Sequence, residues 1–396
     1  MKFHDAHLAY CTNIHPAESW AETFTALKTH TLKVRERLSR EGNRSEGDAY
    51  AIGLRLSAQA ADELLTFNNE GIPEPLRVFK AWLEQENCYI FTINGFPYGD
   101  FHHTRVKEQV YQPDWTQVER LEYTAKLFII LAELLADDID GSVSTLPGSF
   151  KEFKADEHLM FCNLYATARF LDALSEDYGK DFHLGLEPEP LGHFENTGET
   201  LAFFSRFQAW AEERDLETDC LQRRIGVNYD TCHFALEFED AEHSLSAFEH
   251  ADIRISKIHI SSALAFDPTS ATALNEIRTF DEATYLHQIL IQNEDQSTLR
   301  FRDIPEFFEA LAASPDMLAN AADGRCHFHI PLYSAPEQPL GSTQDHAKQT
   351  LAYCKQHPGI CNHFEIETYT WGVLPEDLQI PVEQQIGNEY AWVLDQ

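Results

Sequence analysis

The sequence predicts a (β/α)8 TIM barrel, an α/β fold in which parallel strands form a closed inner sheet and helices cover it. Short apolar runs alternate with long amphipathic segments along the whole chain. The 396 residues, 43% of them hydrophobic, suffice for one barrel of this kind. No tract rich in Pro, Gly and Ser interrupts the alternation. We therefore expect a single decorated domain over residues 1–396.

The first half of the chain supplies the opening strands and helices. Ser19 and Glu22 have the spacing of a capping box, and apolar residues follow them at helical intervals. The strand before this helix is predicted at residues 8–15. The remaining elements of this half are predicted as strands at 50–56, 88–94 and 142–146 and as helices at 57–65, 73–86, 114–137 and 156–178.

The second half contains more candidate strands than the barrel can use. Strands are predicted at 182–187, 225–230, 254–260, 326–332 and 363–369, with helices at 197–213, 244–252 and 342–356. Nine candidates then compete for the eight strand positions of the barrel. Either one of them is an addition, or residues 264–325 form an insertion before the last strands that brings a strand of its own.

Composition and charge exclude several kinds of partner. Asp and Glu number 65 against 30 Lys and Arg, a formal charge of −35, which opposes binding to nucleic-acid phosphates. The most apolar stretch, residues 127–136, carries Glu133 and is too short to span a bilayer. The first residues lack a signal-peptide pattern, so we expect a cytoplasmic protein without a transmembrane segment. The eight cysteines contain no C-x-x-C pair and are expected to be mostly buried thiols.

Polar side chains gather near the carboxyl ends of the predicted strands. Residues alternate between the two faces of a strand, and one face of each run is apolar, as packing against helices requires. A barrel interior that served stability alone would be filled by branched apolar residues. The interior here is therefore expected to form an active site at the carboxyl-end mouth. Its polar set is Asn13, His15, Arg55, Ser57, Thr92, Asn94, Glu187, Glu189, Asn228, Asp230, Lys257, His259, Ser261, His327, His329, Glu365 and Glu367.

This polar set predicts a metal ion. Burying several carboxylates together is costly unless a cation or protons compensate their charge. A mixture of carboxylate oxygens and imidazole nitrogens suits one Mn²⁺, Mg²⁺ or Zn²⁺ ion better than a thiolate-selective metal.

Four motifs of the chain resemble the xylose-isomerase-like sugar isomerase/epimerase superfamily of TIM barrels. The motifs are GLEPEP at 185–190, NYDTCH at 228–233, KIHI at 257–260 and FEIET at 364–368. The resemblance implies one divalent metal held by a glutamate, an aspartate, a histidine and a final glutamate from successive late strands. Carried onto this sequence, the ligands are Glu187, Asp230, His259 and Glu367, with His233 near the substrate.

Two choices within this ligand set stay open. His329 is an alternative to His259, because KIHI lies at a fitting distance after Asp230 and HFH, at 327–329, at a fitting distance before Glu367. Glu189 and Glu365 share a face with their motif partners; we prefer Glu187 and Glu367 because they lie nearer the strand ends.

Longer motifs resemble the EboE family, the TIM-barrel proteins of ebo metabolite-traffic gene clusters. They are YCTNIHP at 10–16 with ESW at 18–20, GFPYGDFH at 95–102, STLP at 144–147, HFHIPL at 327–332 and ETYTW at 367–371. This resemblance spans most of the chain. It implies a role in producing or exporting a small metabolite, with other ebo-cluster proteins as partners, and it supplies no reaction.

The leading hypothesis is a metal-dependent isomerase or epimerase acting on a sugar, cyclitol or hydroxy ketone. Glu187 and Glu367 would be the catalytic bases, on opposite faces of the reacting carbon. The expected substrate contacts are His15, Arg55, Asn94, His102 and His233, with Trp20, Phe96 and Trp371 as apolar walls.

Two other functions compete with this hypothesis. A protein that binds or carries a metabolite can use the same cavity without turnover, although the number of acidic ligands favours an enzyme. A metal-dependent phosphodiesterase or endonuclease would need a basic surface, which the charge of −35 opposes.

Overall fold

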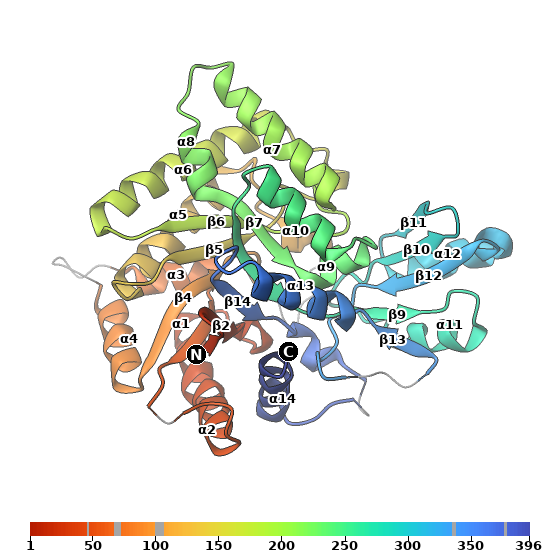
Figure 1. The fold of residues 1–396 in the computed structure, drawn as a ribbon, viewed down its shortest axis with the longest axis horizontal. Coiled ribbons are helices and arrows are strands. Elements are labelled where there is room, and N and C mark those ends of the chain that lie inside the picture. The colour runs from red at the N-terminus through yellow and green to blue at the C-terminus, as the bar shows by residue number, and fades with distance from the viewer. Residues whose placement is uncertain (46, 67–72, 100–106, 335–337, 376–377) are drawn as a thin grey trace.

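Eight parallel strands form the inner sheet of the barrel (Figure 1). The computed structural model describes residues 1–45, 47–66, 73–99, 107–334, 338–375 and 378–396. Within these residues the sheet order is β1-β2-β14-β8-β7-β6-β5-β4-β3. β1 (Lys2–Phe3) pairs antiparallel with β2 at one edge. The parallel strands are β2 (Ala6–Tyr10), β3 (Tyr50–Arg55), β4 (Cys88–Asn94), β5 (Gly141–Thr145), β6 (Phe182–Leu186), β7 (Ile225–Asp230), β8 (Ile255–Ile260) and β14 (His363–Ile366).

The sheet closes on itself between β2 and β3. Cys11, directly after β2, forms a parallel bridge with Gly53 of β3. A Cβ atom on Gly53 would lie 2.1 Å from Glu365 Oε1 and 2.8 Å from the Tyr10 carbonyl oxygen. The strands can approach this closely because residue 53 has no side chain. The predicted (β/α)8 barrel is confirmed.

Helices cover the outer face of the barrel. Ser19 begins α1 with the predicted capping box, in which its side chain accepts from the Glu22 backbone and Glu22 returns the bond. A π-helical turn, Leu27–Thr31, joins α1 to α2. The helices of the barrel are α1 (Trp20–Ala26), α2 (Leu32–Arg40), α3 (Ala58–Leu64), α4 (Glu74–Gln85), α5 (Val118–Leu134), α6 (Glu157–Tyr178), α7 (Thr197–Glu212), α8 (Asp219–Arg224), α9 (Thr231–Leu236), α10 (Ala241–His250), α13 (Gln344–Gln356) and α14 (Val382–Leu394).

An antiparallel sheet stands beside the barrel, between β8 and β14 in the sequence (Figure 1). Its strand order is β11-β10-β12-β9-β13. Leu264, Ile289 and Phe307 belong to a hydrophobic core of its own. Its elements are β9 (Leu264–Phe266), α11 (Ala271–Ile277), β10 (Ile289–Asn293), β11 (Thr298–Phe301), α12 (Ile304–Ala313), β12 (Ala321–Cys326) and β13 (Leu340–Ser342).

The predicted strand at residues 326–332 is wrong, and it is the surplus candidate among the nine. β12 ends at Cys326 and pairs within the second sheet. Phe328 and Ile330, whose alternation suggested a barrel strand, pack into the core of the second sheet instead. The predicted strand at 8–15 is also too long, because it ends at Tyr10 and a 3₁₀ turn follows at Thr12–Ile14.

The barrel interior is polar, as the alternation of side chains predicts. Lys257 Nζ on β8 lies 2.5 Å from Glu365 Oε2 on β14, and both side chains are fully buried. Across the interior, His363 Nδ1 lies 2.7 Å from Ser142 Oγ. These contacts join strands that are not all neighbours in the sheet, which is possible only for inward-pointing side chains.

The amino-terminal end of the barrel is closed by an aspartate between two histidines. His183 Nε2 lies 3.2 Å from Asp140 Oδ2, and His363 Nε2 lies 3.2 Å from Asp140 Oδ1. Arg254 Nη2 also reaches Asp140, at 3.4 Å. Burial, followed by the charge of Arg254, lowers the pKa of His183 to about 3. Contacts to one aspartate therefore link three side chains at this end of the barrel.

Among the described helices, none combines the length and the apolar composition that crossing a bilayer requires.

Candidate metal centre and active site

Four buried side chains that could hold a metal ion converge at the carboxyl-end mouth of the barrel. The atoms that Glu187, Asp230, His259 and Glu367 offer all lie within 4.8 Å of one another. His259 Nδ1 lies 3.2 Å from Glu187 Oε1, 3.6 Å from Asp230 Oδ2 and 3.3 Å from Glu367 Oε2. The four residues come from β7, β8 and the ends of β6 and β14, so the barrel alone brings them together.

Each carboxylate of this group has one oxygen held by the protein and one oxygen directed at His259. Asn228 Nδ2 donates to Glu187 Oε2 at 2.7 Å. Asn13 Nδ2 and Asn94 Nδ2 both donate to Glu367 Oε1 at 2.8 Å. The oxygens left over, Glu187 Oε1 and Glu367 Oε2, are the ones nearest to His259 Nδ1.

Asp230 follows the same pattern through the start of α9. Its Oδ1 accepts from Cys232 N at 2.7 Å, His233 N at 3.2 Å and Ser261 Oγ at 2.6 Å. Its Oδ2 is buried and has no hydrogen-bond partner among the described residues, with His259 Nδ1 3.6 Å away. A buried carboxylate oxygen without a donor is costly, and a cation would remove that cost.

His259 is oriented by a second carboxylate on its far side. Its Nε2 lies 2.8 Å from Glu365 Oε2, which leaves Nδ1 facing the three ligand carboxylates. Lys257 balances the charge of Glu365; against the effect of burial, Lys257 and His259 lower the pKa of Glu365 to about 2. Metal-binding histidines commonly donate their other ring nitrogen to a carboxylate in this way. The residues present therefore fit a divalent cation.

Charges in the group act on one another because water is excluded. Burial lowers the pKa of His259, but Glu367 and Glu187 outweigh it, and the result lies well above the ordinary value. Burial raises the pKa of Asp230, but the charges of His233, His329 and His259 outweigh burial and lower this pKa well below the ordinary value of an aspartate. Burial, with Glu187 next, raises the pKa of Glu189 well above its usual range. Glu189 therefore favours its neutral form more than an ordinary glutamate does, in contrast to Asp230.

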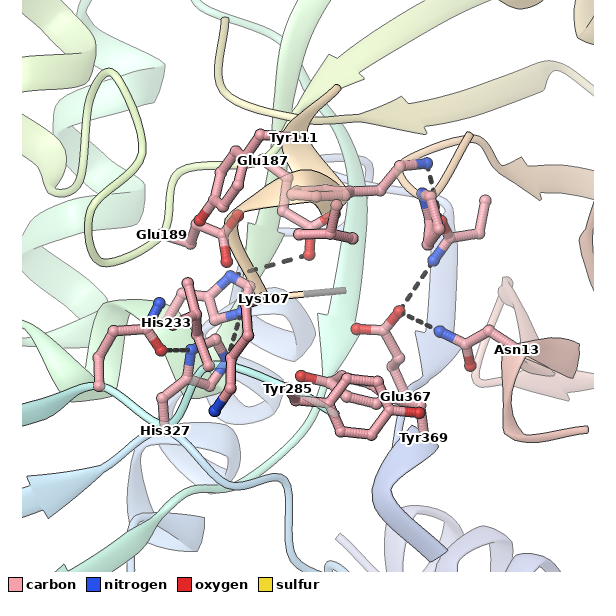
Figure 2. A pocket seen from close by; sticks show the side chains of 16 residues that line it. Asn13, Lys107, Tyr111, Glu187, Glu189, His233, Tyr285, His327, Glu367 and Tyr369 are labelled. Atoms are coloured by element: carbon pink, nitrogen blue, oxygen red, sulfur yellow. Dashed lines mark hydrogen bonds and ion pairs between the residues drawn. The ribbon is translucent and has the colours of Figure 1, made fainter. Parts of the chain in front are cut away.

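A cavity lined by Glu187 and Glu367 opens at this mouth (Figure 2). Its wall combines the barrel mouth, the segment before α5 and the second sheet, which contributes Gln288 next to β10 and His327 next to β12. The lining residues are Asn13, Asn94, Phe96, Pro97, Lys107, Val110, Tyr111, Glu187, Glu189, His233, Tyr285, Leu286, Gln288, His327, Glu367 and Tyr369.

Three of the expected substrate contacts and walls lie in this lining, namely Asn94, Phe96 and His233. His102 lies outside the described residues. His15 stacks on His30 with ring centroids 4.5 Å apart. Arg55 donates to the carbonyl oxygens of Ala17 and Gly99, which ties two loops of the mouth together.

The two expected tryptophan walls serve packing instead. Trp20 stacks on Phe24, with centroids 5.1 Å apart, and contacts Phe79 of α4. Trp371 Nε1 donates to the Ile380 carbonyl oxygen at 2.8 Å. Neither tryptophan is among the described residues that line the cavity.

His259 and His329 occupy different positions at the mouth. His259 lies among the ligand carboxylates, whereas His329 Nδ1 bonds to the Glu367 backbone oxygen at 2.9 Å. His329 Nε2 lies 3.3 Å from His327 Nε2. Burial, then His233 and His329, lower the pKa of His327 well below its usual value.

Sequence reasoning missed several lining residues, including Lys107, Tyr111, Tyr285 and Tyr369. Lys107 is buried and forms an ion pair with Asp303 at 2.6 Å. Nothing in the local pattern assigns Tyr285 or Gln288 to the site, because they precede a strand of the second sheet. The alternation HFH at 327–329 was the one signal that this segment faces a polar space.

Comparison with known proteins shows similarity in fold but not in sequence family. No protein-family model matches the chain, and no curated protein matches it. Among solved structures, the probable 3-DHS dehydratase AsbF of Bacillus anthracis, involved in petrobactin synthesis, is similar with 12% identity and a TM-score of 0.46, over 98% of both chains.

Two further structures are similar to a comparable degree. The IOLI protein with a bound zinc atom has 12% identity and a TM-score of 0.46, over 98% of this chain and 95% of the other. The 3-keto-D-glucoside 4-epimerase YcjR of E. coli has 12% identity and a TM-score of 0.41, over 98% of this chain and 99% of the other. The assignment of a (β/α)8 barrel rests on the strand pairing of this structure and not on these similarities. Fold and site together define a (β/α)8 barrel with a buried carboxylate–histidine centre at the carboxyl ends of its strands.

Proposed function

We propose that the protein is a divalent-metal-dependent isomerase or epimerase of a small polyhydroxylated metabolite such as a sugar, a cyclitol or a hydroxy ketone. The observation that carries the proposal is the shared arrangement of Glu187, Asp230 and Glu367, each with one oxygen held and the other turned toward His259 Nδ1. Mn²⁺, Mg²⁺ or Zn²⁺ bound there would supply Lewis-acid stabilisation of negative charge on adjacent substrate oxygens.

Glu187 and Glu367 are the proposed bases. They come from the ends of β6 and β14, which β7 and β8 separate in the sheet, so the two carboxylates approach a bound substrate from different sides. One carboxylate takes the proton from the carbon next to the substrate carbonyl. Return of a proton from the other side gives the epimer, and return to the neighbouring carbon gives the isomer.

Hydrogen bonds tune the two bases differently. Glu367 accepts from Asn13 and Asn94, and such bonds favour its ionised form. Glu187 accepts from Asn228. Burial and the charge of Glu187 raise the pKa of Glu189, which favours the neutral carboxyl that could donate a hydrogen bond to a substrate oxygen in the cavity.

The motifs that resemble the EboE family support a place for this reaction in a pathway that makes or exports a metabolite. On this proposal the substrate is a small molecule that enters the cavity lined by Glu187 and Glu367. Cytoplasmic location and contact with other ebo-cluster proteins are part of the same proposal.

Proton exchange tests the proposal directly. The protein, loaded with Mn²⁺ or Zn²⁺, is incubated in D₂O with a panel of ketoses and keto-cyclitols, and loss of the C–H signal next to the carbonyl is followed by NMR. We expect exchange with wild type and a loss of about 100-fold or more in Glu187→Gln and Glu367→Gln. The matched control is Glu237→Gln, a buried glutamate paired with Arg300.

The control should keep wild-type exchange. Binding of a panel compound without exchange in wild type would contradict catalysis and favour a metabolite carrier.

A further inference from the structure

A buried glutamate of α14, the last labelled helix in Figure 1, lies behind the barrel mouth. The Glu389 side chain is fully buried, and its neighbours on the inner side of α14 include Ile386, Tyr390 and Val393. A leucine at this position would pack against the barrel without the cost of taking a carboxylate out of water. Packing alone therefore does not account for a glutamate here.

The Glu389 carboxylate joins three segments that are far apart in the sequence. Its Oε2 accepts from Tyr10 Oη, at the end of β2, at 2.7 Å. Its Oε1 accepts from Thr368 Oγ1, beyond β14, at 2.7 Å and from Leu332 N, beyond β12, at 3.1 Å. Gln385 Nε2, one turn earlier in α14, lies 3.5 Å from Oε2.

These donors are neutral, and none of the residues that the structure describes forms an ion pair with Glu389. Burial raises the pKa of Glu389 to about 6, although the bonds from Thr368 and Tyr10 act against it. A buried carboxylate without a cation is a weak source of stability, whereas a buried polar network with its donors in place fixes geometry. The geometry that Glu389 fixes is the relative position of the three segments.

The bond to Thr368 reaches the site most directly. Thr368 follows Glu367 in the sequence, and its side chain is fully buried. β14 ends at Ile366, so strand pairing no longer holds the backbone at Thr368. The hydroxyl bond to Glu389 therefore restrains the backbone from which the Glu367 side chain extends.

The Leu332 segment returns to the same ligand. His329, in the run 327–332, has its Nδ1 2.9 Å from the Glu367 backbone oxygen. The Thr370 hydroxyl donates to the His329 carbonyl oxygen, so this run and the residues after β14 lie against each other. Oε1 of the α14 carboxylate holds both segments, while Oε2 is anchored on β2.

We propose that Glu389 is a positioning residue for Glu367 and acts through Thr368. This inference rests on the proposed function, because it takes Glu367 as a metal ligand. α14 then contributes to metal binding without touching the ion. Loss of Glu389 should lower metal affinity about tenfold, the smaller of the effects known for groups that orient metal ligands.

Co²⁺ tests the inference, because its visible absorption depends on the arrangement of its ligands. The full-length protein is freed of metal and titrated with Co²⁺, and the affinity and the absorption spectrum are recorded. We expect Glu389→Leu to bind Co²⁺ about tenfold more weakly and with an altered spectrum. Glu389→Gln should restore both, since its amide oxygen can accept from Thr368 and Leu332 while its NH₂ group donates to Tyr10 Oη.

Two single variants form a matched pair, because each removes one hydroxyl that lies 2.7 Å from the carboxylate. Thr368→Val removes a bond to Oε1 and should reproduce the altered spectrum, which keeps the test open if Glu389→Leu does not fold. Tyr10→Phe removes the bond to Oε2 and should keep the wild-type spectrum and affinity. Urea unfolding reports the stability of each variant separately.

A wild-type spectrum and affinity in folded Glu389→Leu would overturn the inference and leave the proposed function intact. Equal changes in Thr368→Val and Tyr10→Phe would also overturn it, because they would indicate a general loosening of the fold. Co²⁺ binding with these differences but without proton exchange in wild type would contradict only the proposed reaction. A wild-type protein that binds no Co²⁺ would contradict the metal centre and this inference with it.

Discussion

His259 Nε2 and Glu365 Oε2 lie 2.8 Å apart on the neighbouring strands β8 and β14, fully buried. This hydrogen bond fixes which ring nitrogen of His259 is turned toward the ligand carboxylates. Glu365 itself is held by Lys257 at 2.5 Å. The three side chains form one unit in which charge balance and ring orientation depend on each other.

A double-mutant cycle separates these two roles. Glu365→Gln should lower metal affinity about 10- to 100-fold by releasing His259. It should also destabilise the fold by about 3–5 kcal/mol, because it leaves Lys257 buried without an anion. Lys257→Met combined with Glu365→Gln should recover most of that stability but not the affinity. Denaturant unfolding and metal titration are the measurements; wild-type affinity in the double variant would refute the orienting role.

Asp230→Asn should separate capping from metal binding. Asn caps a helix about as well as Asp, so α9 should remain intact and the unfolding free energy of the metal-free protein should change by less than about 1 kcal/mol. In the asparagine variant, either the NH₂ group or an uncharged amide oxygen takes the position of the carboxylate oxygen directed at His259. Metal affinity should therefore fall at least tenfold. Asp240→Asn, at the equivalent cap of α10, should change neither quantity. Equal affinities of the two variants would remove Asp230 from the ligand set.

Gly53→Ala should disturb the closure of the barrel. The added methyl would meet Glu365 Oε1 and the Tyr10 carbonyl oxygen at distances that no packing tolerates. We expect a loss of about 3 kcal/mol or more in unfolding free energy. Gly47→Ala, whose new Cβ would have no described atom within 4 Å, is the control and should be close to neutral. A Gly53→Ala protein as stable as the control would mean that β2 and β3 can separate without cost.

Acid should weaken the fold through His183 at the amino-terminal end of the barrel. Burial lowers the folded-state pKa of His183 to about 3, below the unfolded value of 6.5, so the unfolded chain binds more protons between these values. Stability therefore falls as pH drops below about 6.5, by about 2 kcal/mol from pH 7 to pH 5 for this residue. His183→Gln should reduce the difference measured by urea unfolding at the two pH values.

The exposed His243→Gln serves as its control and should leave the pH difference unchanged. An identical pH difference in His183→Gln and wild type would show that another group controls the acid response.

The barrel and the polar mouth were predictable because both depend on local periodicity. Alternation within strands such as 88–94 and 225–230 separates the helix-facing side from the interior, and those two strands were placed correctly. Periodicity does not reveal which distant segment covers the mouth. The second sheet brings Tyr285, Gln288 and His327 to the cavity through its own core, and the sequence showed only a surplus strand there.

The substrate contacts were harder to predict for a related reason. Residue type fixes what a side chain can bind, and packing decides whether it reaches the cavity. Arg55 was predicted as a substrate contact, but its guanidinium donates to two backbone carbonyl oxygens and lies 3.5 Å from Glu18. Trp20 was predicted as an apolar wall of the substrate site, but it fills the space between α1 and α4.

The bond from Asn13 Nδ2 to Glu367 Oε1 joins residues 354 positions apart. During synthesis the first strand leaves the ribosome long before the last one, and domains complete folding only when their final strands are available. A nascent chain that stops short of β14 lacks Glu365 and Glu367, so it can hold the earlier carboxylates but cannot complete the coordination sphere. Under the proposed function, the metal would therefore be bound only after the last strand has been synthesised, and chains that end before β14 should bind it weakly.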